Sequence, residues 1–154
     1  ARSGYFDKRY AIGDLAEGFD PTYDGRLEQN IYAYPPQGAP DGGAFCTAGD
    51  LHAFLAALRQ RQLLPAGLTD DFFTCQVPSD DGGPGGQGFG LVFNDLGSYK
   101  EGESEGASGI VSHFSIWEAD VGILSNTMDG TWRVLGECVR RAREAHGDTA
   151  PPAR

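Results

Sequence analysis

The stretch YKEGESEGASG, residues 99–109, places one lysine among three glutamates and three glycines in an acidic chain. A lysine in a strand is most often a solvated charge at a sheet edge. The glycines favour a second interpretation, because glycine weakens a strand unless a ligand or another backbone must approach closely. A lysine beside such a backbone offers a positive charge and N–H groups to an anionic or carbonyl substrate. From the residues alone both interpretations stay open, and Lys100 is the candidate site residue.

The three histidines offer little further chemistry. His52 lies within a helical stretch and His146 near a helix end, so both are predicted to be surface residues. His113 alternates with Phe114 in a strand-like run and can face either the core or the solvent. No histidine or cysteine spacing typical of a metal site is present, so we expect neither a metal nor a cofactor.

A nucleophile motif is absent from this sequence. There is no Gly-x-Ser-x-Gly elbow, no serine is followed three residues later by lysine, and no tyrosine is followed two residues later by asparagine. By themselves, these residues therefore offer one lysine charge beside a strand whose glycines leave the backbone accessible.

The strongest local pattern is a helix in DGGAFCTAGDLHAFLAALRQRQLL. Thr47 followed by Asp50 resembles a capping box, which predicts a helix over residues 48–61. Its apolar face is formed by Leu51, Phe54, Leu55 and Leu58. A second, short helix is predicted to begin near Thr69.

Three strand-like runs follow, at residues 89–93, 107–116 and 121–127. Their short connections predict an antiparallel meander, since parallel crossovers need longer connections. A final helix is expected to begin near Asp129 or Thr131 and to end at Gly147. Its expected buried stripe is Trp132, Leu135, Val139 and Ala142. The predicted fold class is α+β, with a three-stranded antiparallel sheet and flanking helices.

The connecting segments carry turn signals. Asp24-Gly25 lies between short aromatic segments and predicts a hairpin, and the prolines at 35 and 36 end any strand there. Residues 79–88 have the composition of a loop. We expect one domain over residues 1–154, loop-rich over 1–45 and with a flexible tail at 147–154.

The charge balance excludes several classes of partner. A formal net charge of −10 argues against nucleic acid and against an anionic membrane surface. No apolar run is long enough to cross a membrane. The three cysteines show no metal spacing and are interpreted as free buried thiols, which favours a reducing compartment such as the cytoplasm.

Taken together, PDGGAFCTAGDLHAFLAALRQRQLL, the meander and GILSNTMDGTW resemble the C-terminal part of the serine β-lactamase and penicillin-binding-protein superfamily, in its class C-like branch. The resemblance covers roughly residues 20–145. It implies acyl transfer on an ester, amide or β-lactam, by a serine of a Ser-x-x-Lys motif assisted by a Tyr-x-Asn motif.

The third motif of that family would be Lys100-Glu101-Gly102. The resemblance implies that Lys100 sets the charge of the site and attracts a substrate carboxylate. Gly102 would keep the strand thin, and the backbone N–H of Glu103 would form half of an oxyanion hole.

Two departures from the family pattern bear on function. Glu101 replaces a small hydroxyl residue and is expected to repel a carboxylate substrate, which favours an ester. The first two motifs are missing, so we expect the chain to be inactive alone and to require the N-terminal part of a longer hydrolase, or to self-associate. The alternative is a stand-alone, non-catalytic binding domain that uses the same half-fold.

Overall fold

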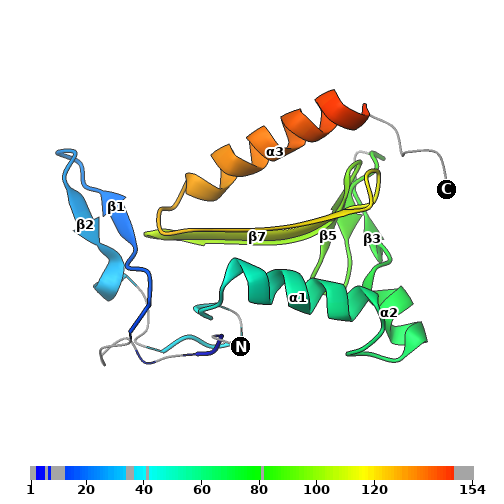
Figure 1. Ribbon diagram of the computed structural model, residues 1–154, viewed down its shortest axis with the longest axis horizontal. Coiled ribbons are helices and arrows are strands. Elements are labelled where there is room, and N and C mark those ends of the chain that lie inside the picture. Colours follow the sequence, from blue (N-terminus) through cyan, green and yellow to red (C-terminus); the bar gives the residue numbers. More distant parts are fainter. Residues whose placement is uncertain are drawn as a thin grey trace.

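The computed structural model describes residues 3–5, 7, 13–33, 37–40, 42–80 and 82–147. Its α+β architecture agrees with the sequence-based prediction. A six-stranded antiparallel sheet has the order β3-β4-β5-β6-β7-β8, so every strand pairs with its neighbours in sequence. The longest strands lie between α1 on one face and α3 on the other (Figure 1). The strands are β3 Val77–Pro78, β4 Gly86–Gln87, β5 Val92–Asn94, β6 Gly97–Ser104, β7 Ala107–Phe114 and β8 Ala119–Ser125.

The predicted count of three strands was wrong, because β3, β4 and β6 were not counted in the predicted sheet. The β6 sequence GSYKEGES is rich in glycine and charge, which gives it low strand propensity. Two tight turns nevertheless form it. Asn94 accepts hydrogen bonds from the Leu96 and Gly97 N–H groups in the first turn, and Gly106 supplies a φ of 66° in the second. Pairing with β5 and β7 therefore overrides the local preference.

The helix after Cys46 confirms the capping prediction. α1 spans Ala48–Arg59, and the Thr47 hydroxyl accepts a hydrogen bond from the Asp50 N–H at 3.0 Å. Leu55 and Leu58 are buried, whereas Phe54, predicted on the same apolar face, is 56% exposed. α1 therefore contacts the sheet through a narrower stripe than the sequence predicts.

The remaining helices differ from the predictions only in detail. α2 spans Ala66–Phe72, so it begins three residues before Thr69, which is buried in its middle. α3 spans Gly130–His146, and Gly147, with a φ of 75°, follows it as the C-cap. The members of its predicted stripe are half-buried rather than buried. The structure describes no helix that is both long and apolar enough to span a membrane.

The N-terminal hairpin predicted at Asp24-Gly25 is also present. β1 Phe19–Pro21 pairs with β2 Leu27–Gln29, and a short 3-10 helix follows at Asn30–Tyr32. Asn30 donates a hydrogen bond from its side chain to the Glu105 carbonyl at 2.7 Å, which ties this hairpin to the β6–β7 turn. Residues 35, 36 and 148–154, for which a strand end and a flexible tail were predicted, lie outside the described residues.

Residues 79–88, expected to be a loop, contain one short strand. Gly86 and Gln87 form β4, and a turn precedes them in the described residues. Gly86 has a φ of 159°, and a Cβ there would lie 2.5 Å from the Val77 carbonyl oxygen. The glycine is therefore required where β3 and β4 approach each other closely.

Two contacts fix the faces of the sheet. On β7, Ser108 donates a hydrogen bond to the Thr131 hydroxyl of α3 at 3.0 Å. On β8, a Cβ added to Gly122 would lie 3.3 Å from the Ala48 carbonyl oxygen of α1. Because side chains alternate along a strand, these contacts define an α3 face and an α1 face for every paired residue.

Candidate functional site

The register of β6 and β7 places the three predicted site residues on two different faces. Lys100 pairs with Val111 and Gly102 with Gly109, which puts both on the α1 face. Glu103 pairs with Ser108, so its side chain lies on the α3 face. All three are exposed. Within the described residues, the Lys100 ammonium has no ion-pair or hydrogen-bond partner.

One side of β6 lacks a partner strand in the described part of the chain. Its pairing with β5 ends at Val92 and Tyr99, whereas pairing with β7 continues to Ser104. We call the unpaired side, from residue 100 to 104, the free edge of β6. Such an edge presents backbone N–H and C=O groups that can hydrogen-bond an added extended chain.

The turns at both ends of β6 determine which backbone groups reach this edge. The two-residue loops 95–96 and 105–106 close on the pairs Asn94–Gly97 and Ser104–Ala107. The closing pair of a two-residue hairpin is hydrogen-bonded, so Ser104 directs its backbone groups toward β7. Strict alternation then directs the N–H and C=O of Glu103 to the free edge, which is the direction an oxyanion-hole donor requires.

Gly102 has space around it. A Cβ added there would meet no atom within 4 Å, and its paired residue across the strand is another glycine, Gly109. Packing of the described residues therefore does not demand glycine at position 102. An open backbone at this point instead leaves room beside the free edge.

Glu101 does not share a face with Lys100. It pairs with Ile110 and lies with Tyr99 and Glu103 on the α3 face. Burial, and then the negative charge of Glu101, raise the pKa of the Tyr99 phenol. The expected repulsion of a carboxylate by Glu101 is therefore directed to the face opposite the lysine.

A cavity of about 480 Å³ lies on the α3 side of β6. Glu101, Gly102, Glu103 and Trp132 line it, and we call it the Trp132 cavity. The Trp132 indole N–H donates a hydrogen bond to the Glu103 carboxylate at 3.1 Å. The cavity thus joins two carboxylates to an aromatic ring from α3.

A second group of polar residues lies on the α1 face. Asp120 accepts two 3.1 Å hydrogen bonds from Arg59 and lies 2.9 Å from Nδ1 of His113. Glu118 also contacts Arg59, at 3.3 Å. His113, for which the sequence left core and solvent open, therefore lies half-buried in an ion-pair cluster that joins α1 to β7 and β8.

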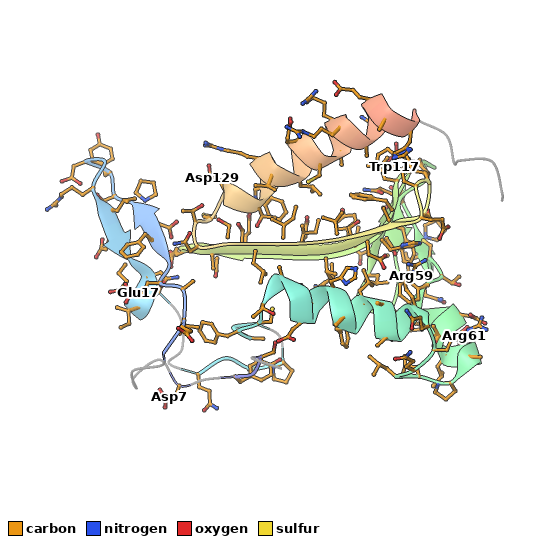
Figure 2. The ribbon with its side chains drawn as sticks, in the orientation of Figure 1. Asp7, Glu17, Arg59, Arg61, Trp117 and Asp129 are labelled. Carbon is orange, nitrogen blue, oxygen red and sulfur yellow. The ribbon has the colours of Figure 1, made fainter. Side chains whose placement is uncertain are left out.

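This cluster borders a smaller cavity of about 260 Å³, lined by Arg59, Arg61, Thr69, Asp70, Phe73 and His113. Figure 2 labels both arginines; Arg59 is the last residue of α1, and Arg61 lies two residues beyond it. Arg61 is paired with Asp70 at 2.7 Å, so each guanidinium already has a carboxylate partner. The cluster is best explained as a support for the sheet rather than as a ligand site.

Solved structures that share this fold include two penicillin-binding-protein homologues. The crystal structure of a penicillin binding protein from Bacillus halodurans matches 90% of this chain with a TM-score of 0.83 and 25% identity, and the match covers 44% of that protein. The octameric penicillin-binding protein homologue from Pyrococcus abyssi matches 88% of this chain with a TM-score of 0.68 and 23% identity, over 34% of its own length. The chain has the fold of part of a penicillin-binding protein.

No family model and no curated protein matches the chain. The resemblance drawn from DGGAFCTAGDL and LSNT is nevertheless confirmed, because both solved structures are penicillin-binding-protein homologues and cover most of the chain. The penicillin-binding-protein-like α+β fold is confirmed with it. The chain spans less than half of the length of either protein, so the roles of Lys100, Gly102 and Glu103 remain predictions.

Two features of this penicillin-binding-protein-like chain escaped the sequence analysis. The sequence predicted Trp132 in a buried stripe. Its indole N–H instead donates a hydrogen bond to the carboxylate of Glu103, which lies 29 residues earlier on β6. The contact between Arg59 and Asp120 joins residues 61 positions apart. The only available signal was that tryptophan and arginine usually find a partner when they are partly buried.

The structure describes no group of three or more histidine, cysteine, aspartate or glutamate side chains placed to hold a metal ion. Among the cysteines, all three thiols are free and half-buried. Burial raises the pKa of the Cys46 thiol, as does the nearby charge of Asp50.

Proposed function

We propose that this chain forms one wall of the acyl-transfer site of a β-lactamase-related serine hydrolase, with the nucleophile supplied from outside the chain. The observation that carries the proposal is the free edge of β6, with the Glu103 N–H directed to it and, on the α1 face, Lys100 without a partner among the described residues. The similarity to penicillin-binding-protein homologues supports the same class of chemistry.

Each of the three residues has a distinct proposed role. The Glu103 N–H donates a hydrogen bond to the oxyanion that develops when a carbonyl is attacked. Lys100 provides positive charge that stabilises the same negative charge and attracts an anionic substrate group. Gly102 leaves the space through which an ester, amide or β-lactam lies along the strand.

The test is replacement of Lys100 by alanine in the complete protein. We expect the rate of acylation by nitrophenyl acetate to fall by roughly tenfold or more, because a charge near the oxyanion is lost. Stopped-flow measurement of nitrophenol release gives this rate. Lys100→Arg should retain most of the activity, since it keeps the charge.

Unchanged acylation kinetics in Lys100→Ala would remove this residue from the site. Arg26→Ala provides a control for altered net charge, since it also removes one positive charge and lies between β1 and β2 with a side chain 81% exposed. It should leave the acylation rate unaltered.

The alternative function is a binding domain without catalysis. Its supporting observation is that the free edge of β6 can accept an extended peptide through backbone hydrogen bonds, with the Lys100 charge beside it. In that case Lys100→Ala would weaken peptide binding, and no acylation would be detected in the protein that carries this chain.

We also propose that the opposite edge of the sheet is covered by the rest of the hydrolase or by a second copy of the chain. β8 is the last strand of the sheet in the described residues, and it reads ADVGILS with Leu124 41% exposed. Long apolar edge strands favour pairing with another chain. The Pyrococcus abyssi homologue is described as octameric, which is compatible with self-association.

Light scattering tests this edge. The 154-residue chain should form dimers or larger species, and Leu124→Lys should shift it toward monomer because a charged side chain disfavours edge pairing. Leu27→Lys, at a 69% exposed residue of β2, is the matched control and should leave the distribution unchanged. A monomeric wild-type chain would contradict pairing with a second copy.

A further inference from the structure

The Trp132 cavity carries the negative charge of two glutamates, and no described lysine or arginine lines it. Glu101 has no ion-pair or hydrogen-bond partner among the described residues. Glu103 uses its Oε2 atom to accept the Trp132 N–H and keeps its second oxygen for another donor. A group that enters the cavity therefore meets two carboxylates and one indole ring.

This combination matches the chemistry of a positively charged amine. An ammonium or quaternary ammonium group gains Coulombic attraction from two carboxylates. It is also attracted to the face of a tryptophan ring, which has the most favourable quadrupole among the aromatic side chains. The volume of about 480 Å³ lies within the range of small-molecule sites. An anionic group would instead be repelled by both glutamates.

The position of the cavity relates it to the free edge of β6. Side chains of an extended chain added to this edge alternate between the two faces of the sheet. One position on that chain would face Lys100 and the next would face Glu101 and Glu103. The edge can therefore recognise a negative group and a positive group on neighbouring units of the same ligand.

We propose that Glu101, Glu103 and Trp132 form a subsite for a cationic amine on the substrate or ligand that lies along the free edge of β6. This inference rests on the proposed function for the identity of the substrate, but the binding step can be measured without catalysis. It gives Glu101 a role as a specificity determinant, where the sequence suggested only a departure from the family pattern.

Binding of choline to the full 154-residue chain tests the subsite, with 3,3-dimethylbutanol as the uncharged compound of the same shape. Nuclear magnetic resonance titration should show shifts of the Trp132 indole N–H and of the Glu101 and Glu103 amides. We expect choline to bind about tenfold or more tightly than 3,3-dimethylbutanol, because the uncharged compound lacks both the Coulombic and the cation–π attraction.

The double variant Glu101→Gln with Glu103→Gln should reduce choline affinity by about tenfold or more, since both charges are removed without loss of volume. Asp80→Asn with Asp95→Asn removes the same charge from two other exposed residues and is the matched control. Trp132→Leu should weaken choline binding while leaving the two carboxylates in place. Equal binding of the two probes, or equal affinity of the double variant and its control, would overturn the proposal.

A second measurement separates this inference from the proposed function. In the complete protein, the ratio of kcat/KM for nitrophenyl 6-aminohexanoate to that for nitrophenyl hexanoate should exceed one. The Glu101→Gln, Glu103→Gln variant should lower this ratio. Choline binding without any acylation would refute the hydrolase proposal and retain the subsite, whereas acylation without choline binding or cation preference would do the reverse.

Discussion

Replacement of Gly97 by alanine is expected to destabilise the protein by about 3 kcal/mol or more. An added Cβ would lie 2.0 Å from the His113 carbonyl oxygen and 2.8 Å from the Ser115 N–H nitrogen. Both are backbone atoms and cannot rotate away. The φ of 152° at this position is also one that residues with a side chain rarely adopt. The cost is a large part of a typical stability of about 5–15 kcal/mol.

Urea denaturation followed by intrinsic fluorescence measures this change. Gly102→Ala is the matched control on the same strand, because a Cβ there meets no atom within 4 Å. We expect that variant to differ from wild type by no more than about 0.5 kcal/mol, with any gain coming from the less flexible unfolded chain. Equal unfolding midpoints for the two variants would show that β6 does not meet β7 as closely as the structure has it.

Loss of the Asp120 carboxylate is the second large effect. Its side chain is 12% exposed and is shared by Arg59, with a side chain 29% exposed, and by His113. Asp120→Ala leaves the partly buried guanidinium with only Glu118 as a described partner. We expect a loss of about 2–3 kcal/mol, below the value for a fully buried pair because water still reaches the arginine.

The control for Asp120→Ala contacts the same arginine from the surface. The Glu118 side chain is 69% exposed and lies 3.3 Å from Arg59, so Glu118→Ala should cost no more than about 0.5 kcal/mol. A double-mutant cycle with Arg59→Ala then isolates the energy of the Arg59–Asp120 pair. If Asp120→Ala and Glu118→Ala unfold at the same urea concentration, the Arg59–Asp120 pair does not stabilise the contact between α1 and the sheet.

The sequence was sufficient for the parts of the fold that depend on local patterns. Thr47 as the N-cap and the apolar repeat that follows it predicted α1, and Gly147 marked the end of α3. Residues 97–104 were treated as a strand around Lys100 but were not counted in the predicted sheet, because their composition favours turns and solvent and the strand is stabilised by its neighbours. Pairing between distant segments is a property of the folded chain and has no local signal.

The candidate site divides in the same way. Lys100 and Gly102 were found because charge beside glycine is visible in a short stretch of sequence. Alternation along a strand places Lys100 and Glu101 on opposite faces, but only the pairing with β7 assigns these faces to α1 and α3. Trp132 joined the cavity only through a contact between α3 and β6.

The two short turns that bound β6 restrict which insertions and deletions the sequence can accept. Insertion or deletion of a single residue in either loop would shift the strand by one position and exchange its faces. Lys100 would then face α3, and Glu101 and Glu103 would move to the α1 side. Loop length is thus a determinant of charge placement, and we expect homologous chains that preserve this polarity to vary the residues of these turns but not their number.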